Sequence, residues 1–413
     1  MWNDFIAPFQ SATFEVALQY AVLLSPLWLP SILLGIFWPL WVNYVRAAFF
    51  FSQKYILLEI KLPKETMKSP LAMELFLTTL HQTSGESTWF DRYWLGKTRA
   101  WFSLEIVSIE GQVKFYIWMR AGLRSLVESG LYAQFPNVEV FESPDYTKSV
   151  HFDPAVMTLW GCDFKLTKPD PYPIKTYVDY GLDKDPKEEF KVDPLTNLIE
   201  FLGAVGVNQQ IWVQLIIRAH KDENKAPGHF WKKTDSWKDE AKKEIEKIRE
   251  EATKPKKDKE GNEIPGFPNP TPGEKDKIAA LERSISKLGY DVGMRALYMG
   301  KKENFNGATI PGMLTSFKQF NGGLNGLAPT NWSTEFNYPW QDFKEIRQNK
   351  MRGEVFEAYR RRSFFFPPYI GKSFVLNTEE LATIYHFPGQ VSQAPALSRI
   401  GSKKAEPPSN LPI

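Results

Sequence analysis

A stretch of thirty residues without a charge, between Glu15 and Arg46, constrains this chain more than any other feature. Its apolar centre runs from Val22 to Val42 and reads VLLSPLWLPSILLGIFWPLWV. A helix needs about 20 apolar residues to cross a hydrocarbon core of roughly 30 Å, and this segment is long enough. We therefore expect residues 1–50 to anchor the chain in a lipid membrane through a single transmembrane helix.

Two alternatives for this segment stay open. Pro26, Pro30 and Pro39 each lack a backbone donor, so they could kink the helix or split it into a re-entrant hairpin. A cleavable signal peptide is the other alternative. Its start should be basic, whereas Asp4 and Glu15 are acidic, and its apolar run is normally shorter than this one.

The charges that flank the segment predict its orientation. Arg46, Lys54, Lys61 and Lys64 follow it, while no basic residue precedes it. Basic residues are enriched on the cytoplasmic side of transmembrane helices. We expect a single-pass protein of the cell membrane with its soluble region in the cytoplasm.

The composition predicts that most of the chain is globular. Of its 413 residues 43% are hydrophobic and 24% are charged. A net charge of +3 is too small to indicate a nucleic-acid partner by itself. The single cysteine, Cys162, excludes an intramolecular disulfide and is expected to be buried and structural.

Residues 51–150 show the element order βαββαβ of a ferredoxin-like unit. Alternating hydrophobicity indicates the strands, and apolar residues at helical spacing indicate the helices. The predicted elements are a strand at 55–62, a helix beginning at Ser69-Pro70, a hairpin at 102–119 with its turn at Glu110-Gly111, a helix at 123–131 and a strand at 138–143.

A similar order recurs in residues 151–340, so the predicted fold class is α+β with two tandem ferredoxin-like units. The predicted elements are a strand at 157–166, a helix beginning at Asp193-Pro194, strands at 211–217 and 290–299, a helix at 310–317 and a closing strand at 325–336.

An insertion at 220–288 separates the central strands of the second unit. Trp237, Ala241, Ile245, Ile248 and Ala252 step by 4, 4, 3 and 4 residues, and a second series, Ile278, Leu281, Ile285 and Leu288, steps by 3, 4 and 3. These spacings are typical of a coiled-coil seam between two antiparallel helices. The insertion is interpreted either as a solvated surface elaboration or as a finger that contacts a partner subunit.

The C-terminal region, 341–413, is predicted to hold two helices and an extended tail. Its first helix, near 341–362, ends in Arg360, Arg361 and Arg362, which precede three phenylalanines. Positive charge beside aromatic rings favours single-stranded nucleic acid. The alternative is a basic helix end, favoured by the helix dipole, followed by buried aromatics. A second helix, at 376–388, has capping-box spacing between Asn377 and Glu380.

No catalytic, cofactor-binding or metal-binding residue is predicted, so we do not expect an enzyme. GKT at 96–98 and GKS at 371–373 resemble the end of a phosphate-binding loop, but Asp91 and Phe366 stand where its first glycine should be. His220 and His229, with Asp222 and Glu223 nearby, match no standard zinc spacing. Glu379 and Glu380 are interpreted as helix-start charges that suit the helix dipole.

Three stretches resemble the N-terminal, non-ATPase region of conjugative DNA-transfer proteins of bacterial and archaeal type IV secretion systems. They are the apolar anchor leading into YILLEIKLP, the block VKFYIWMRAGLRSLVESGLYAQFPNVEVFES, and the tail FVLNTEELATIYHFPG with APALSRIGSKKAEPPSNLP. In those proteins a stretch similar to the tail immediately precedes the motor domain, and these patterns carry no known catalytic residues.

The resemblance implies a membrane-anchored accessory subunit of a DNA-transfer apparatus. No motor follows Ile413 in this sequence, so the motor ATPase is expected as a separate chain or as one missing from this sequence. The alternative is a membrane-tethered protein that binds DNA through its basic C-terminal region. A homo-oligomer of the chain stays open.

Overall fold

The computed structural model of the chain contains two compact units. The helical unit comprises Met1–Gln53 and Gly85–Thr98, and the sheet unit comprises Lys54–Ser84 and Arg99–Ile413. The structure describes residues 12–63, 68–184, 192–221, 224–225, 233–234, 236–253, 256–257, 263–264, 270–333, 336, 338–389 and 399–400.

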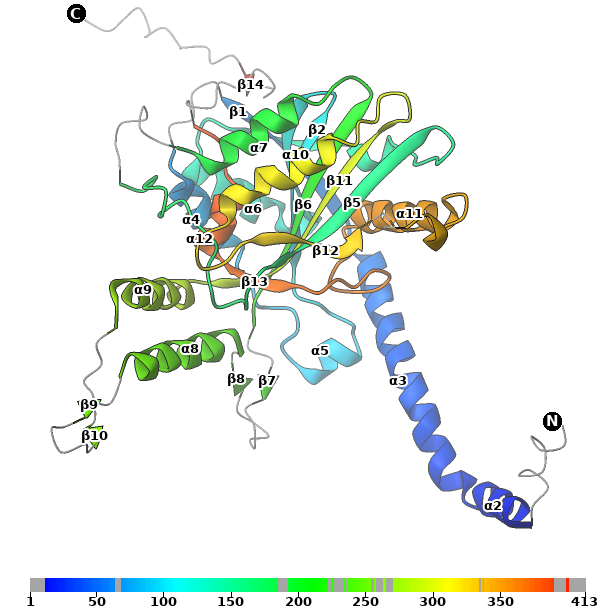
Figure 1. Cartoon of the computed structure of the whole chain (residues 1–413). Coiled ribbons are helices and arrows are strands. Elements are labelled where there is room, and N and C mark those ends of the chain that lie inside the picture. Colours follow the sequence, from blue (N-terminus) through cyan, green and yellow to red (C-terminus); the bar gives the residue numbers. More distant parts are fainter. Residues whose placement is uncertain are drawn as a thin grey trace, which may run out of the picture. The chain divides into compact units, whose positions relative to one another are not determined.

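Most of the apolar segment, from Ser25 on, forms one helix of the helical unit, whereas Val22 and Leu23 end the preceding helix and Pro26 lies in the first turn after the break. This unit contains α2 (Ala12–Leu23), α3 (Ser25–Ser52) and α5 (Trp89–Tyr93) (Figure 1). Among the described residues, α3 is the one helix long and apolar enough to cross a membrane. Pro30 and Pro39 lie inside α3 without ending it, so the segment is not split into a hairpin at these prolines. The helix continues ten residues past the predicted apolar centre, because its last turns are also apolar.

The sheet unit is built on one ten-stranded sheet with the order β12-β5-β11-β6-β2-β3-β1-β14, in which β13 pairs with β11 and β4 pairs with β1. The strands are β1 (Tyr55–Pro63), β2 (Trp101–Ile109), β3 (Gln112–Arg120), β4 (Glu139–Ser143), β5 (Met157–Leu166), β6 (Gln209–Ala219), β11 (Gly289–Lys301), β12 (Leu327–Ser333), β13 (Phe374–Asn377) and β14 (Arg399–Ile400).

The sheet has two halves that share one pattern of pairing. The first half has the order β4-β1-β3-β2 and the second β12-β5-β11-β6, with every pair antiparallel. Strands β2 and β6 join the halves through an antiparallel ladder from Trp101↔Arg218 to Ile109↔Gln210. The mixed α+β class is therefore as predicted, and the two halves form one continuous sheet.

Helices cover both faces of the sheet (Figure 1). One face packs against α4 (Pro70–Leu80), α6 (Arg124–Gln134), α7 (Pro194–Gly203), α10 (Thr309–Ser316) and α12 (Thr378–Ile384), and the other against α11 (Ile346–Arg360). Successive strand residues point to opposite faces. Ile106 accordingly belongs to the larger core and Val107 to the smaller core under α11.

Side-chain caps start three of these helices where the sequence predicted them. Ser69 caps α4, Asp193 caps α7, and Asn377 caps α12, each accepting a hydrogen bond from a backbone N–H of the first turn. Asn377 and Glu380 form the predicted capping box. These short-range signals depend on neighbouring residues only, which is why the sequence predicts them well.

The insertion contains helices α8 (Ser236–Ala252) and α9 (Pro272–Ser286), between β6 and β11. Ile245, Ile248 and Leu281 are buried together, and Tyr172 from the sheet unit packs against them. Leu288, predicted as the last seam residue, is exposed because α9 ends before it. Asp222, Glu223, His229 and the extended tail at 403–413 lie outside the described residues.

Candidate functional site

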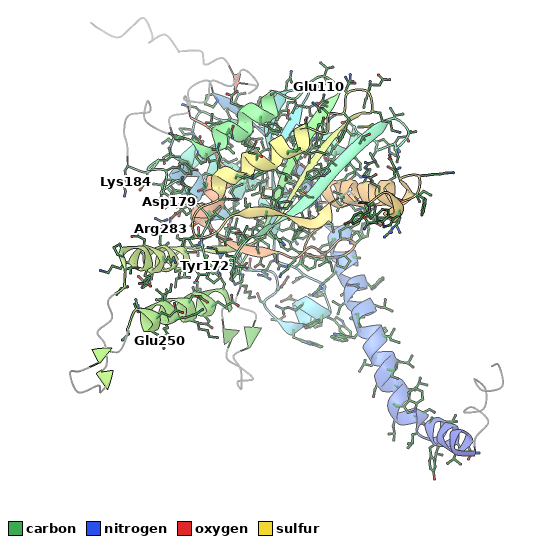
Figure 2. All side chains as sticks on the ribbon, in the orientation of Figure 1. Glu110, Tyr172, Asp179, Lys184, Glu250 and Arg283 are labelled. Atoms are coloured by element: carbon green, nitrogen blue, oxygen red, sulfur yellow. The ribbon has the colours of Figure 1, made fainter. Side chains whose placement is uncertain are left out.

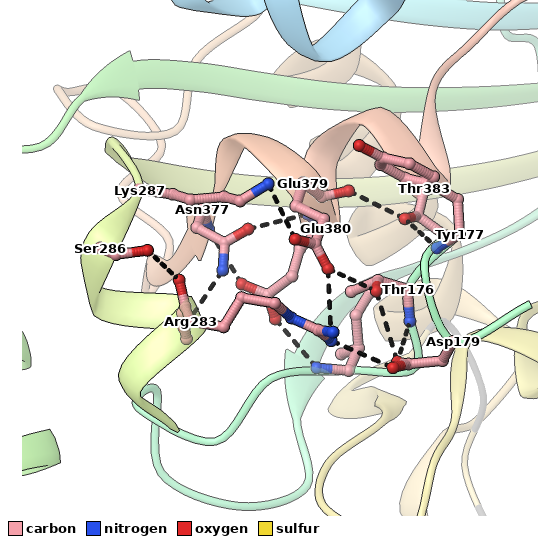
Figure 3. A network of polar contacts seen from close by, with 12 residues as sticks. Thr176, Tyr177, Asp179, Arg283, Ser286, Lys287, Asn377, Glu379, Glu380 and Thr383 are labelled. Atoms are coloured by element: carbon pink, nitrogen blue, oxygen red, sulfur yellow. Dashed lines mark hydrogen bonds and ion pairs between the residues drawn. The ribbon is translucent and has the colours of Figure 1, made fainter. Parts of the chain in front are cut away.

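Residues 374–387, which contain β13 and α12 and are here called the tail segment, are held in the sheet unit by a network of polar side chains, the tail network (Figure 3). Its members come from four parts of the chain that are distant in sequence: α4, the loop at 174–184, the end of α9, and α12. They are Glu74, Thr176, Asp179, Arg283, Lys287, Asn377, Glu379 and Glu380.

Glu379 is the centre of the tail network and is almost completely buried. Its carboxylate lies 2.8 Å from the Lys287 ammonium and 3.4 Å from the Arg283 guanidinium. The Thr176 hydroxyl donates to it at 2.5 Å. Burial disfavours a charged lysine, yet the hydrogen bonds to Glu379 and Glu74 keep the pKa of Lys287 above its usual value. A buried charge is tolerated only with such partners.

Glu380 is buried beside Glu379, but no cation among the described residues pairs with it. Its carboxyl accepts the backbone N–H groups of Asn377 and Ile174, each at 2.9 Å. Burial raises the pKa of Glu380 to about 8, and the negative charges of Glu379 and Asp170 add to this against the two hydrogen bonds. The group therefore titrates close to neutral pH.

Arg283 and Lys287 connect the insertion to this segment. Arg283 also pairs with Asp179 at 3.0 Å, and Lys287 with Glu74 at 2.6 Å. Figure 2 shows Asp179, Arg283 and Tyr172 on the side of the sheet unit where α8 and α9 lie. The base of the insertion therefore belongs to the same polar network as the tail.

His386 fixes the end of the tail segment. Its imidazole lies 3.1 Å from both carboxylate oxygens of Asp193, the cap of α7. Burial favours the neutral ring, but the Asp193 charge raises the pKa of His386 overall. The ion pair lowers the pKa of Asp193 against the effect of burial.

A second buried cluster lies under α11 and contains one of the three predicted DNA-contacting arginines. The Arg362 guanidinium pairs with Glu105 at 2.9 Å and with Asp145 at 2.6 Å. The hydroxyl of Tyr146 bonds Glu105 and that of Tyr359, each at 2.8 Å. Burial disfavours the charged guanidinium, but Glu105 and Asp145 raise the pKa of Arg362.

The other two predicted DNA-contacting residues are more accessible. Arg360 is the last residue of α11 and Arg361 comes directly after it. Both pair with Glu357, at 2.7 and 3.2 Å. The following aromatic run packs inward at Phe364, whose ring touches Gly293 and Gly371. The structure thus separates buried Arg362 from Arg360 and Arg361, and DNA contact by the latter two stays a prediction.

The residues that resemble a phosphate-binding loop have structural contacts of their own. Lys97 pairs with Asp91 at 2.9 Å. Gly371 lies against the ring of Phe364, where a Cβ atom would come within 2.4 Å. Cys162 is buried, and burial raises the pKa of its thiol. His220 bonds Asp291 at 2.7 Å, and in the described part of the chain no three His, Cys, Asp or Glu side chains group as metal ligands.

The tail network can hold together segments that are distant in the sequence. This role of Glu379 and Glu380 was not predicted from the sequence. Both lie in the first turn of α12, as the sequence interpretation has it, and both are in addition almost completely buried. A signal was present in the sequence, because FVLN and LATIYHF, which flank the pair, are mostly apolar. Charged residues inside such an apolar run are expected to be buried and paired.

No curated protein matches the chain. A family model described as "Domain of unknown function (DUF8128)" matches residues 52–399. The matched range begins at the end of α3 and includes both halves of the sheet, the insertion and the tail network. The chain is therefore a member of the DUF8128 family.

Proposed function

We propose that this chain is a membrane-anchored accessory subunit of a type IV secretion-like DNA-transfer apparatus, in which it docks a separate motor ATPase. The observation that carries the proposal is the way the tail segment is held by the tail network. In the proteins that this chain resembles, a similar stretch immediately precedes the motor. A tail fixed by Lys287, Arg283 and Asp193 suits an attachment point for such a partner.

The anchor is α3, and the sheet unit faces the cytoplasm in this proposal. Arg46 lies in the last two turns of α3, and Lys54 and Lys61 follow its end; cytoplasmic flanks are enriched in basic residues. A reporter fused to the C-terminus should be active in the cytoplasm. A reporter active only on the outer side would contradict this orientation.

We also propose that the sheet consists of two ferredoxin-like units, 51–150 and 151–340. The strand orders β4-β1-β3-β2 and β12-β5-β11-β6 support this assignment, as do the helices that follow the first and third strand of each half. The fold alone does not specify an activity.

The experiment compares three tagged chains in the organism that encodes them: the wild type, Glu379→Gln, and Glu303→Gln as a control at an exposed glutamate. After crosslinking and membrane solubilisation, the wild type and the control should retain the P-loop ATPase of the transfer apparatus. Glu379→Gln should retain less, because Lys287 and Arg283 each lose one of their two charged partners. Deletion of the gene should abolish DNA transfer. Unchanged transfer, with no ATPase retained by the wild type, would refute the proposal.

Direct DNA binding is the alternative function. Arg360 and Arg361 are the accessible members of the basic cluster, each already paired with Glu357. If they contact phosphates, affinity should fall steeply with salt, and Arg360→Ala with Arg361→Ala should reduce this salt dependence. Binding that is absent at low salt would exclude the alternative.

A further inference from the structure

The segment Gly85–Thr98 belongs to the same compact unit as α3 and contacts it directly. The indole N–H of Trp41 donates to the carbonyl of Tyr93 at 3.0 Å. The rings of Trp41 and Trp94 lie 5.4 Å apart, and those of Trp38 and Tyr93 lie 5.5 Å apart. The segment is thus packed on α3 by aromatic contacts at Trp38 and Trp41, near the middle of the helix.

A glycine permits the closest approach between the two elements. Gly96 has φ +61, and a Cβ atom there would lie 2.3 Å from the carbonyl oxygen of Val45. A larger residue would clash with the backbone of α3 and would also be strained at this φ. The packing of the segment on α3 is therefore specified by the sequence.

The segment also carries large apolar side chains that are about half exposed. Trp89, Phe90 and Trp94 are 59, 50 and 52% exposed, and Leu95 is 41% exposed. The charge of Asp91 is paired with Lys97 at 2.9 Å and bonded by Thr88. Exposed aromatics gathered in this way are costly in water and usually mark an interaction surface.

The position of this surface along α3 indicates its partner. With 28 residues, α3 is about 42 Å long, which exceeds the roughly 30 Å of the hydrocarbon core. Counted from Ser25, about 20 residues of helix cross the core, so the membrane–water interface falls near Tyr44 and Val45, one turn beyond Trp41. Tryptophan is enriched at this interface because its ring is apolar and its N–H is polar.

We propose that residues 85–98 form a second membrane contact, with Trp89, Phe90, Trp94 and Leu95 inserted into the interfacial layer of a lipid bilayer. The exposed apolar surface of α3 continues into this patch through the Trp38 and Trp41 contacts. The inference rests on the proposed membrane anchoring by α3. It adds that the chain is held at the interface by two elements that are distant in sequence.

The test uses the full chain in bilayers of phosphatidylcholine and phosphatidylglycerol, with spin labels at single cysteines. Cys162 is the only native cysteine and is replaced first, by Cys162→Ala. Labels are placed through Phe90→Cys and, separately, Trp89→Cys. Val207→Cys is the matched control, because Val207 is 67% exposed on the loop between α7 and β6. Leu33→Cys reports on the insertion of α3 itself.

Power saturation then compares the access of oxygen, which dissolves in lipid, with that of a water-soluble nickel complex. Labels at positions 90 and 89 should favour oxygen several-fold relative to position 207, and position 33 should favour it most. If the label at position 33 favours oxygen while the labels at 90 and 89 behave like the label at 207, the second membrane contact is refuted and anchoring by α3 is retained. If position 33 also reads water, both proposals fail. Labels at 90 and 89 that are shielded from both reagents would indicate a protein interface and overturn the inference.

Discussion

The guanidinium of Arg362 lies 2.9 Å from the carboxylate of Glu105, although 257 residues separate the two in the sequence. Arg362 follows α11, and Glu105 lies on the central strand β2. Both side chains are at most 2% exposed. The pair therefore connects the end of α11, which covers one face of the sheet, to β2, which lies between the two halves.

Replacing Arg362 should destabilise the protein strongly, because Glu105 and Asp145 would lose their buried cation. We expect Arg362→Met to lower the free energy of unfolding by about 3–5 kcal/mol. Arg361→Met is the matched control, since Arg361 is exposed and should change stability little. Thermal melts of the purified full chain followed by circular dichroism measure both. Equal effects of the two changes would contradict the role assigned to Arg362.

The Glu380 carboxyl should make stability depend on pH near neutrality. Its folded pKa of about 8 exceeds the usual 4.5, so between these values the folded state holds a proton that the unfolded state has lost. Its contribution is complete below about pH 4.5 and is lost as the pH rises through about 8.

Melting curves from pH 5 to pH 9 test this pH dependence. The wild type should lose stability by at least about 1 kcal/mol more than Glu380→Gln over this range, because one pKa unit corresponds to roughly 1.4 kcal/mol. The exposed Glu303→Gln should keep the slope of the wild type. A Glu380→Gln variant with that same slope would show that Glu380 is ionised throughout.

Removing the insertion should weaken the sheet unit. Replacing residues 221–286 by a short Gly-Ser linker deletes Arg283 and Ser284, which contact Glu379 and Asn377. We expect a lower melting temperature with cooperative melting retained, because the β6–β11 ladder remains. A shorter replacement at 254–269 leaves α8 and α9 in place and should melt like the wild type. Loss of cooperative melting in the larger deletion would place these helices in the core.

The purified chain should not hydrolyse ATP. Lys97 is paired with Asp91, and Gly371, next to Lys372, lies against Phe364, so neither segment is arranged around a phosphate. Phosphate release should stay at background at every ATP concentration. Saturable hydrolysis that is lost in Lys97→Ala or Lys372→Ala would overturn this prediction.

The strands and helix caps were predictable because their signals are local. The strand predicted at 157–166 has the bounds of β5, and Ser69, Asp193 and Asn377 cap the helices predicted for them. Hydrophobic alternation and capping depend on residues a few positions apart. These patterns are sufficient to predict a mixed α+β fold.

The buried charges were harder to predict, since their environment comes from distant parts of the chain. Arg362 is typical of the basic end of a helix in the sequence, whereas the structure places Glu105 and Asp145 beside it. Glu379 is a helix-start charge as predicted, but its partners Lys287 and Arg283 reach it from the insertion. The partner of a charged side chain cannot be read from its sequence neighbours.

The short connection from α3 to the sheet has a mechanical consequence. Only Gln53 and Lys54 separate α3 from β1, which pairs with β3 on one side and with β4 on the other. Ladder hydrogen bonds between antiparallel strands run perpendicular to the strands. A pull along β1 therefore loads two rows of bonds in shear at the same moment, instead of peeling them apart singly. The strand joined to α3 is therefore one that resists extraction from the sheet.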